Sequence, residues 1–454
     1  MIEESDLLSL AEFAVKKAMA KGADQAEAWI EQAIETNVTL ERNDVNSGSS
    51  SQYSGIGIRV IKDRGLGFAS LNLLSSKLIE RAASDAVAIA RYAAPIEHNA
   101  LPEKQPLTRV EIFDPASSLF DVEDALAMSS ELLKVAKDHD KRVMVDYGMF
   151  SATIGSQAIC SSEGIAAEEK SSVFIWQLLG MAREGDDVGS YAASFDATIR
   201  VRDINVQNTA EDFARKAIHS LGAKQVDSFA GSLIMTPLAA AGFIMSPLVS
   251  SVLADNLQKG RSQFAGREGV QVASECINLR DDGTIPQAIG SGAFDREGSP
   301  HAPIKIITDG QFVSPLYNFF AASREEKETS GHAVGSYRTV PRIGPTNLIL
   351  EGTGDKVQKV DQVIENIKKG IIVTRFSGDI DPISGYFSGL VKGGFYVANG
   401  EINHPVASVT IQGNIFESIN SIGAIAQELK RVGSWTLPEL LEFEQIQFIS
   451  ERGR

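Results

Sequence analysis

The longest stretch without a charged residue limits what this chain can fold into more than any other feature. Between Asp227 and Asp255 lie 27 residues with no Asp, Glu, Lys or Arg. This length would span a bilayer if the segment were one apolar helix. The segment also contains Pro237, Pro247, five serines and two glycines, which make a poor lipid-facing helix. We therefore expect no membrane span and predict a buried or partner-facing helical segment.

The composition of the whole chain is typical of a large soluble protein. It has 454 residues, 43% of them hydrophobic, which is enough for two or three domains. The 43 Lys and Arg against 59 Asp and Glu give a net charge of −16, which argues against a nucleic-acid-binding role because such proteins need a basic surface. Only Cys160 and Cys276 are present, and the first residues are acidic, unlike a secretory signal. These features predict a cytoplasmic protein.

Apolar residues recur at helical spacing in four places in the first half of the chain. The first helix follows Ser5 and Asp6, either of which suits the N-cap position, and it ends before Gly22. The fourth helix is expected to begin at Thr209. Alternating apolar residues between the helices predict antiparallel strands. The predicted helices cover residues 7–18, 74–94, 122–136 and 209 onwards, and the predicted strands lie at 38–40, 56–60 and within 142–176.

The second half of the chain is expected to be mainly β. Residues 1–225 hold 13 Gly and 4 Pro, whereas residues 226–454 hold 26 and 11, which favours turns in the second half. Thr236 and Ser246 are each followed by proline, as at the N-cap of a short helix. Asn399-Gly400 is typical of a two-residue hairpin turn. Strands are predicted at residues 304–308, 347–350, 371–374, 395–398 and 406–411.

Together these patterns predict an α+β fold. Two N-terminal α+β units, with antiparallel sheets and helices, precede a larger, glycine-rich, mainly β C-terminal domain. We assign residues 1–110 to the N-terminal domain, 111–225 to the middle domain and 226–454 to the C-terminal domain.

The residue types that usually carry catalysis form no recognisable group in this sequence. No two of the six histidines lie within one helical turn, so the histidine pair of a helical zinc site is absent. No G-x-S-x-G motif occurs. Residues 290–292 lack the third glycine of a dinucleotide loop, and Asp379 and Asp381 lack the rest of a calcium loop. Motif analysis alone therefore assigns no catalytic residue and no metal ligand.

Several short sequence segments nevertheless follow one another in the order typical of a known family. Residues 21–28 read Lys-Gly-Ala-Asp-Gln-Ala-Glu-Ala, and residues 55–69 combine two glycine-rich strand segments. The later blocks lie at residues 266–274, 281–284, 289–298, 384–388, 394–401 and 405–414. In sequence and order these blocks resemble the TldD/PmbA family, which comprises predicted zinc proteases and their inactive relatives and is also called the modulators of DNA gyrase.

The catalytic subunits of that family carry His-Glu-x-x-x-His on a helix and a later Cys as third zinc ligand. The matching positions in this chain hold Met245, Ser246 and Ser250, and no Cys follows Cys276. Met is a poor zinc ligand, and serine replaces neither the glutamate base nor the histidine imidazole. The resemblance therefore implies the TldE/PmbA type of subunit, which has no metal or other cofactor of its own.

The resemblance also implies a partner. We expect a heterodimer in which a TldD-like subunit supplies zinc and this chain, itself non-catalytic, completes a chamber for unfolded or extended peptides. For the isolated chain, a homodimer stays open as an alternative to that pair. Two alternatives stay open: a stand-alone peptidase with a divergent, non-zinc site, and a regulatory binding protein of a toxin or gyrase system.

Two segments are candidates for lining the peptide cleft, by family position only. Strand addition to an exposed sheet edge is the expected binding mode because it tolerates many peptide sequences. The alternative for both segments is a purely structural turn. The candidate residues are Gly290, Ser291, Gly292 and Asp295 in the first segment and Ser384, Gly385 and Ser388 in the second.

Overall fold

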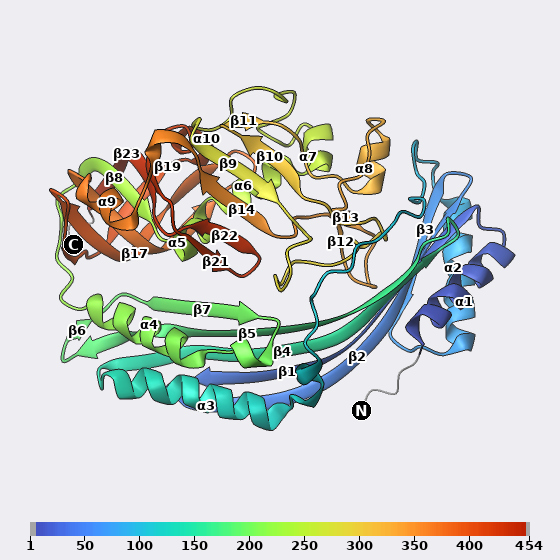
Figure 1. Ribbon diagram of the computed structural model, residues 1–454, viewed down its shortest axis with the longest axis horizontal. Helices are drawn as coiled ribbons and strands as arrows, with labels where there is room; N and C mark the ends of the chain where they lie inside the picture. The colour runs from blue at the N-terminus through green and yellow to red at the C-terminus, as the bar shows by residue number, and fades with distance from the viewer. Residues whose placement is uncertain (1–5, 451–454) are drawn as a thin grey trace.

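The computed structural model describes residues 6–450 of the chain. Its N-terminal half forms one long, curved antiparallel sheet, and the C-terminal half lies on the concave side of that sheet (Figure 1). The strand order is β3-β2-β1-β4-β5-β6, with β7 also paired to β5. The strands are β1 (Gln25–Glu41), β2 (Asp44–Lys62), β3 (Gly65–Leu71), β4 (Val143–Ser161), β5 (Ala166–Glu184), β6 (Asp187–Val188) and β7 (Ala192–Thr198).

The two N-terminal α+β units share this sheet. β1 of the first unit pairs with β4 of the second from Glu27 opposite Ser161 to Glu41 opposite Tyr147. Each unit contributes two helices, and each pair of helices buries its own apolar cluster against the sheet. These helices are α1 (Leu7–Ala20), α2 (Ser76–Tyr92), α3 (Val122–His139) and α4 (Val206–His219).

The ends of the first and fourth helices show how well capping could be predicted. Asp6 caps α1 by accepting a hydrogen bond from the N–H of Ser9 at 2.9 Å, whereas Ser5 lies outside the described residues. The predicted start of α4 at Thr209 is wrong. Asn205 caps α4 instead. Thr209 is buried, and its hydroxyl accepts a hydrogen bond from the indole N–H of Trp176 at 2.7 Å.

The C-terminal half contains two larger sheets and a two-stranded one. In one larger sheet β8 pairs with both β16 and β23, so β8, β16, β17, β19 and β23 close into a ring of strands. The other has the order β11-β10-β9-β14-β22-β21. The ring sheet comprises β8 (Phe229–Met235), β15 (Val357–Gln358), β16 (Lys369–Ile380), β17 (Tyr386–Ala398), β18 (Glu401–Pro405), β19 (Val409–Asn414), β20 (Ile422–Ala426) and β23 (Leu441–Ser450).

The remaining elements of this half are short. The second sheet comprises β9 (Ile277–Asp281), β10 (Ile304–Thr308), β11 (Gln311–Phe312), β14 (Leu348–Gly352), β21 (Leu429–Val432) and β22 (Trp435–Pro438), and β12 (Ala333–Val334) pairs with β13 (Arg342–Ile343). The helices are α5 (Pro237–Phe243), α6 (Met245–Val252), α7 (Ala254–Gln258), α8 (Phe319–Ser323), α9 (Val360–Glu365) and α10 (Ile415–Ser418).

The predicted hairpin turn between β17 and β18 is confirmed. Asn399 and Gly400 connect the two strands with φ angles of 51° and 80°. Both values lie in the left-handed region that a two-residue hairpin turn of this kind requires. Asn and Gly adopt that region at little cost.

The uncharged segment forms β8, α5 and α6 and packs into the C-terminal core. The Phe243 ring of α5 lies 4.5 Å from the Phe387 ring and 5.1 Å from the Phe376 ring, measured between centroids. Thr236 precedes α5 as predicted, but Ser246 lies inside α6 rather than at its cap, because only Ile244 separates the two helices. No helix within residues 6–450 is long and apolar enough to cross a membrane.

Candidate functional site

The three positions that match the zinc motif point in different directions on α6. Met245 has no exposed surface and belongs to the C-terminal core cluster. Ser246 is exposed and Ser250 is partly exposed. The backbone and side-chain oxygens of Ser250 accept hydrogen bonds from the Asn256 side-chain amide at 2.8 and 3.3 Å. The motif positions therefore provide one buried thioether and two hydroxyls.

This set does not fit zinc. Zinc sites in proteins use imidazole, thiolate or carboxylate groups that converge on one point. Across the described part of the chain, no three His, Cys, Asp or Glu side chains lie close enough together to hold a metal ion. Cys276 is buried, and its sulfur lies 3.2 Å from the Ser274 hydroxyl. Met245 and Cys276 are accounted for by packing.

The second candidate segment, residues 384–388, covers the end of the turn between β16 and β17 and the first residues of β17. Asp381 accepts hydrogen bonds from the N–H groups of Ile383 and Ser384 and from the Ser384 hydroxyl, and these bonds hold the pKa of Asp381 below its usual range. Gly385 has a φ of +76°, and a Cβ atom there would lie 2.4 Å from the Phe416 ring. Ser388 follows within β17. The turn is thus defined by local bonds and by close packing.

Next to this turn, β16 has a free edge. β8 pairs only with Gly370 to Val373, so residues 374–380 have β17 on one side and no strand on the other among the described residues. The Phe376 ring covers Gly378, where a Cβ atom would lie 2.7 Å from it. The same ring contacts Phe243 of α5. The free edge of β16 therefore begins beside the helices that follow β8.

The first candidate segment, residues 290–298, lies elsewhere, against the N-terminal sheet. The N–H of Gly290 donates to the Asn347 side chain at 3.1 Å, and the Asn347 amide donates to the Ser291 hydroxyl at 2.8 Å. The N–H of Ala293 donates to Glu169 of β5 at 2.9 Å. Burial raises the pKa of Glu169. A Cβ atom at Gly292 would lie 3.0 Å from the same carboxylate. This segment is fixed to its neighbours along its length.

The carboxylate of Asp295 organises the turn at the end of this segment. It accepts hydrogen bonds from the N–H groups of Glu297 at 2.8 Å, Ser299 at 3.0 Å and Ala333 at 2.9 Å. Burial is the main cause of the raised pKa of Asp295, and the nearby Glu297 carboxylate raises this pKa further. The hydrogen bonds that the Asp295 carboxylate accepts thus come from backbone groups of the protein itself.

A buried cluster of charges ties the same turn to the sheet. Arg59 of β2 lies 2.7 Å from Glu27 of β1 and 2.9 Å from Glu297. Arg296 lies 3.1 Å from Glu27, and its guanidinium carbon lies 4.8 Å from the centre of the Trp29 ring. Burial opposes the charge of Arg59, but the two carboxylates raise its pKa above the usual range. No local sequence pattern predicts this cluster, because its partners are up to 269 residues apart.

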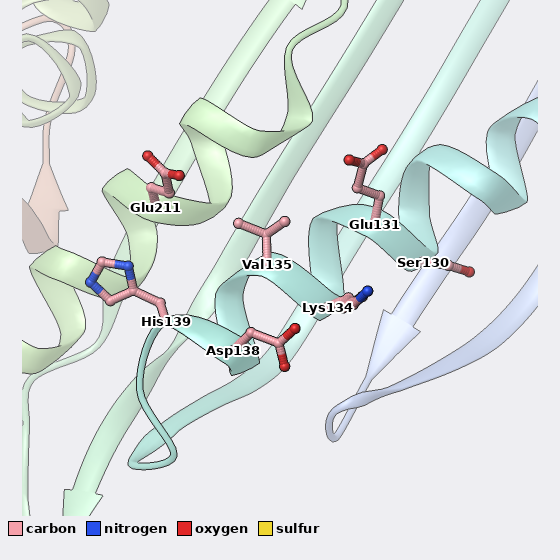
Figure 2. A pocket seen from close by; sticks show the side chains of 7 residues that line it. All are labelled: Ser130, Glu131, Lys134, Val135, Asp138, His139 and Glu211. Carbon is pink, nitrogen blue, oxygen red and sulfur yellow. The ribbon is translucent and has the colours of Figure 1, made fainter.

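The pocket in Figure 2 lies between α3 and α4, on the side of the sheet away from the C-terminal half. It is a hollow of about 620 Å³ with mixed charges and one apolar side chain. Its position separates it from α6 and from both candidate segments. The residues that line it are Ser130, Glu131, Lys134, Val135, Asp138, His139 and Glu211.

Models of three family domains match consecutive parts of the chain. The PmbA/TldA metallopeptidase domain 1 matches residues 26–90, the central domain matches residues 116–221 and the C-terminal domain matches residues 230–450. The chain belongs to the PmbA/TldD family. Each matched range lies inside one of the three segments predicted from the sequence, whose boundaries we keep as a proposal.

Individual relatives match this PmbA/TldD family member along most of its length. An uncharacterized protein of Methanocaldococcus jannaschii is 27% identical and aligns over 87% of this chain and 89% of its own. The metalloprotease PmbA of Escherichia coli O157:H7 is 24% identical over 92% of each chain. The crystal structure of TldE from Thermococcus kodakarensis superposes with a TM-score of 0.90 at 21% identity, over 97% of this chain and 100% of that chain. This likeness shows a shared fold.

Proposed function

We propose that this chain is the TldE/PmbA-type subunit of a metalloprotease complex and does not itself hold the zinc ion. The observation that carries the proposal is the chemistry of α6. Met245 fills the core where the family motif has its first histidine, and Ser246 and Ser250 replace the glutamate and the second histidine. These groups supply neither the ligands nor the general base of zinc-dependent peptide hydrolysis.

The partner in this proposal is a TldD-like subunit with an intact zinc helix. Together the two subunits would hydrolyse unfolded or extended peptides, with this chain completing the peptide chamber. The buried, unpaired state of Cys160 and Cys276 supports a reducing, cytoplasmic location for this complex.

The free edge of β16 is the peptide-binding element that we propose for this chain. Residues 374–380 offer backbone N–H and C=O groups to an extended peptide, which is the basis of strand addition. Arg375 and Asp379 lie on this edge, and the nearby Tyr386 side chain is 65% exposed. In this arrangement Ser384, Gly385 and Ser388 flank the peptide, whereas residues 290–298 support the junction of the two halves.

The decisive experiment combines the purified chain with a TldD-like partner. We expect a complex by light scattering after size exclusion, and hydrolysis of an unfolded peptide that exceeds the activity of the partner alone and stops with a chelator. The chain alone should be inactive. Failure to associate, or no gain over the partner alone, would overturn the proposal. Chelator-insensitive hydrolysis by the isolated chain would favour the stand-alone peptidase.

Hydrogen exchange tests the peptide-binding edge separately. A complex incubated with an uncleavable extended peptide should show slower exchange in residues 374–380. Residues 47–55 of β2, which form a second free edge on the N-terminal sheet, serve as the internal control and should not respond to the peptide. Protection confined to the partner subunit would show that this chain does not bind the peptide.

A further inference from the structure

Two basic residues lie opposite each other on β16 and β17 without an acidic partner. Arg375 of β16 pairs directly with Lys392 of β17 in the antiparallel register. Directly opposite residues share one face of a sheet, with Cβ atoms about 4.5–5.5 Å apart, and like charges in this arrangement repel each other. Within residues 6–450, neither side chain forms an ion pair or a hydrogen bond with another residue. A negative group is therefore the missing complement of this pair.

The guanidinium group of Arg375 is partly enclosed by the protein. Its Nε atom is buried and has no hydrogen-bond partner in the described chain. Burial lowers the pKa of Arg375, and the Tyr191 phenol offsets this effect only in part. The Tyr191 hydroxyl itself donates a hydrogen bond to Asp146 at 2.8 Å. A buried donor without a partner costs free energy unless a bound group satisfies it.

The pair lies on the outer face of the ring sheet, where the two halves of the molecule meet. The neighbouring Phe376 ring packs against α5 in the core, and consecutive residues of a strand point to opposite faces, so Arg375 points outward. The loop before β7 approaches this face, because the N–H of Gly393 donates to the Ser190 hydroxyl at 2.8 Å. β7 also contacts β16 at the junction of the halves (Figure 1).

We propose that Arg375 and Lys392 bind a carboxylate of the peptide that adds to the free edge of β16. The position of the peptide rests on the proposed function. In an added strand, one residue lies directly opposite Arg375 and on the same face, within reach of its guanidinium group. The planar guanidinium matches the two oxygens of a carboxylate, and the Lys392 ammonium adds positive charge. The carboxylate comes from an Asp or Glu side chain or from the C-terminus of the peptide.

The charge along this edge also sets the register of the peptide. Asp379 lies four residues after Arg375 in β16, so the two side chains share one face and are roughly 13 Å apart along the strand. Asp379 repels a carboxylate on the added strand, whereas Arg375 attracts it. A peptide with a single acidic residue therefore binds with that residue opposite Arg375.

The test measures the binding of fluorescent extended peptides to the full chain by anisotropy. Three peptides of one sequence are compared: one with an internal Glu and an amidated C-terminus, one with Gln in its place and a free C-terminus, and one with Gln and an amidated C-terminus. We expect at least one of the two carboxylate-bearing peptides to bind about fivefold to tenfold more tightly than the neutral one. The first two peptides distinguish the side-chain carboxylate from the terminal one.

Substitutions assign the preference to the two basic residues. Arg375→Gln should reduce it to less than about twofold, and Lys392→Gln should reduce it in part. Arg375→Gln should not lower the midpoint of thermal unfolding, because the side chain bonds to no other described residue. The control Arg81→Gln removes the same charge from an exposed pair with Asp85 on α2 and should leave the preference unchanged. Equal binding of all three peptides, or an unchanged preference in Arg375→Gln, would overturn the proposal.

The outcomes separate this site from the proposed function. Peptide binding that slows amide exchange in residues 374–380 without a charge preference would overturn the carboxylate site and leave the peptide-binding edge in place. Binding of acidic peptides by a chain that forms no active complex would support the site and count against the proposed function. Failure of the chain to bind any of the peptides would overturn both the site and the edge.

Discussion

Two buried regions of this molecule differ sharply in charge. The α5–α6 region contains no charged residue from residue 228 to residue 254 and fills the C-terminal core. The junction between the sheet and the C-terminal half instead buries Glu27, Arg59, Arg296 and Glu297. The family motif would place polar chemistry in the first region, yet this chain concentrates its buried charge in the second. Buried charge in this chain therefore joins the two halves of the molecule.

We expect the largest loss of folding stability when the charge cluster is broken. Glu297→Gln removes one of the two carboxylates that compensate Arg59, so we expect the free energy of unfolding to fall by about 3–5 kcal/mol. Urea denaturation measures this loss. Glu268→Gln, which breaks an exposed pair with Lys327, is the control and should cost about 0–1 kcal/mol. Equal losses for both variants would contradict a special role for the cluster.

In the uncharged region, the equivalent experiment is the loss of a core side chain. Met245→Ala should lower the free energy of unfolding by about 2–5 kcal/mol, because it leaves a cavity beside α6. Met19→Ala, at a position that is 37% exposed, should cost clearly less. If Met245→Ala costs no more than Met19→Ala, the Met245 side chain does not pack in the core as described.

His301, whose ring lies 3.6 Å from the Cβ position of Gly292 in the first candidate segment, should make the stability depend on pH. Burial and the neighbouring His332 lower the pKa of His301 to about 4, so between pH 6.5 and 4 the unfolded chain binds a proton that the folded chain does not. Stability is therefore lost as the pH falls through this range, by on the order of 2 kcal/mol from His301. Between pH 7 and pH 4.5, His301→Asn should lose less stability than the wild type, because the opposite contribution of Asp295, whose raised pKa stabilises the fold at lower pH, is present in both proteins. His139→Asn, at an exposed position, should retain the wild-type difference.

The smallest effect is expected at the exposed motif position. Ser246→Glu restores the glutamate of the motif but neither of its histidine ligands. Because the position is exposed, the free energy of unfolding should change by less than about 0.5 kcal/mol. Elemental analysis after incubation with zinc should find no stoichiometric metal. Tight binding of one zinc ion by this variant would show that other residues near α6 complete a site.

Features set by neighbouring residues could be predicted from the sequence. The burial of the uncharged segment, the Asp6 cap and the Asn399-Gly400 hairpin each depend on a few adjacent side chains. The start of α4 could not be predicted, because the hydroxyl of Thr209 accepts a hydrogen bond from Trp176 of a strand that is distant in sequence. The pairing of β1 with β4 could not be predicted either, because an alternating pattern indicates a strand but not which strand lies beside it.

In the candidate site, too, features that depend on distant contacts could not be predicted from the sequence. The resemblance to the family identified Met245, Ser246 and Ser250 as the positions of the zinc motif. It did not predict that Met245 faces the core while Ser246 is exposed. Charged residues on buried strand positions, such as Glu27 and Arg59, were the one signal of the charge cluster. Arg59 and Glu27 bind each other, but their other partners, Glu297 and Arg296, lie more than 200 residues later, so no local pattern predicts the whole cluster.

The closed ring of strands in the C-terminal half has a consequence for how the protein is made. β8 pairs with β23, and Ser232 donates a hydrogen bond to Glu442 across that pair, 210 residues further along the chain. A ribosome adds roughly 5–20 residues per second, so β8 waits tens of seconds for its last partner. During that interval one edge of the apolar strand β8 has no strand to pair with. Nascent chains stalled before β23 should therefore bind chaperones more strongly than chains released after it.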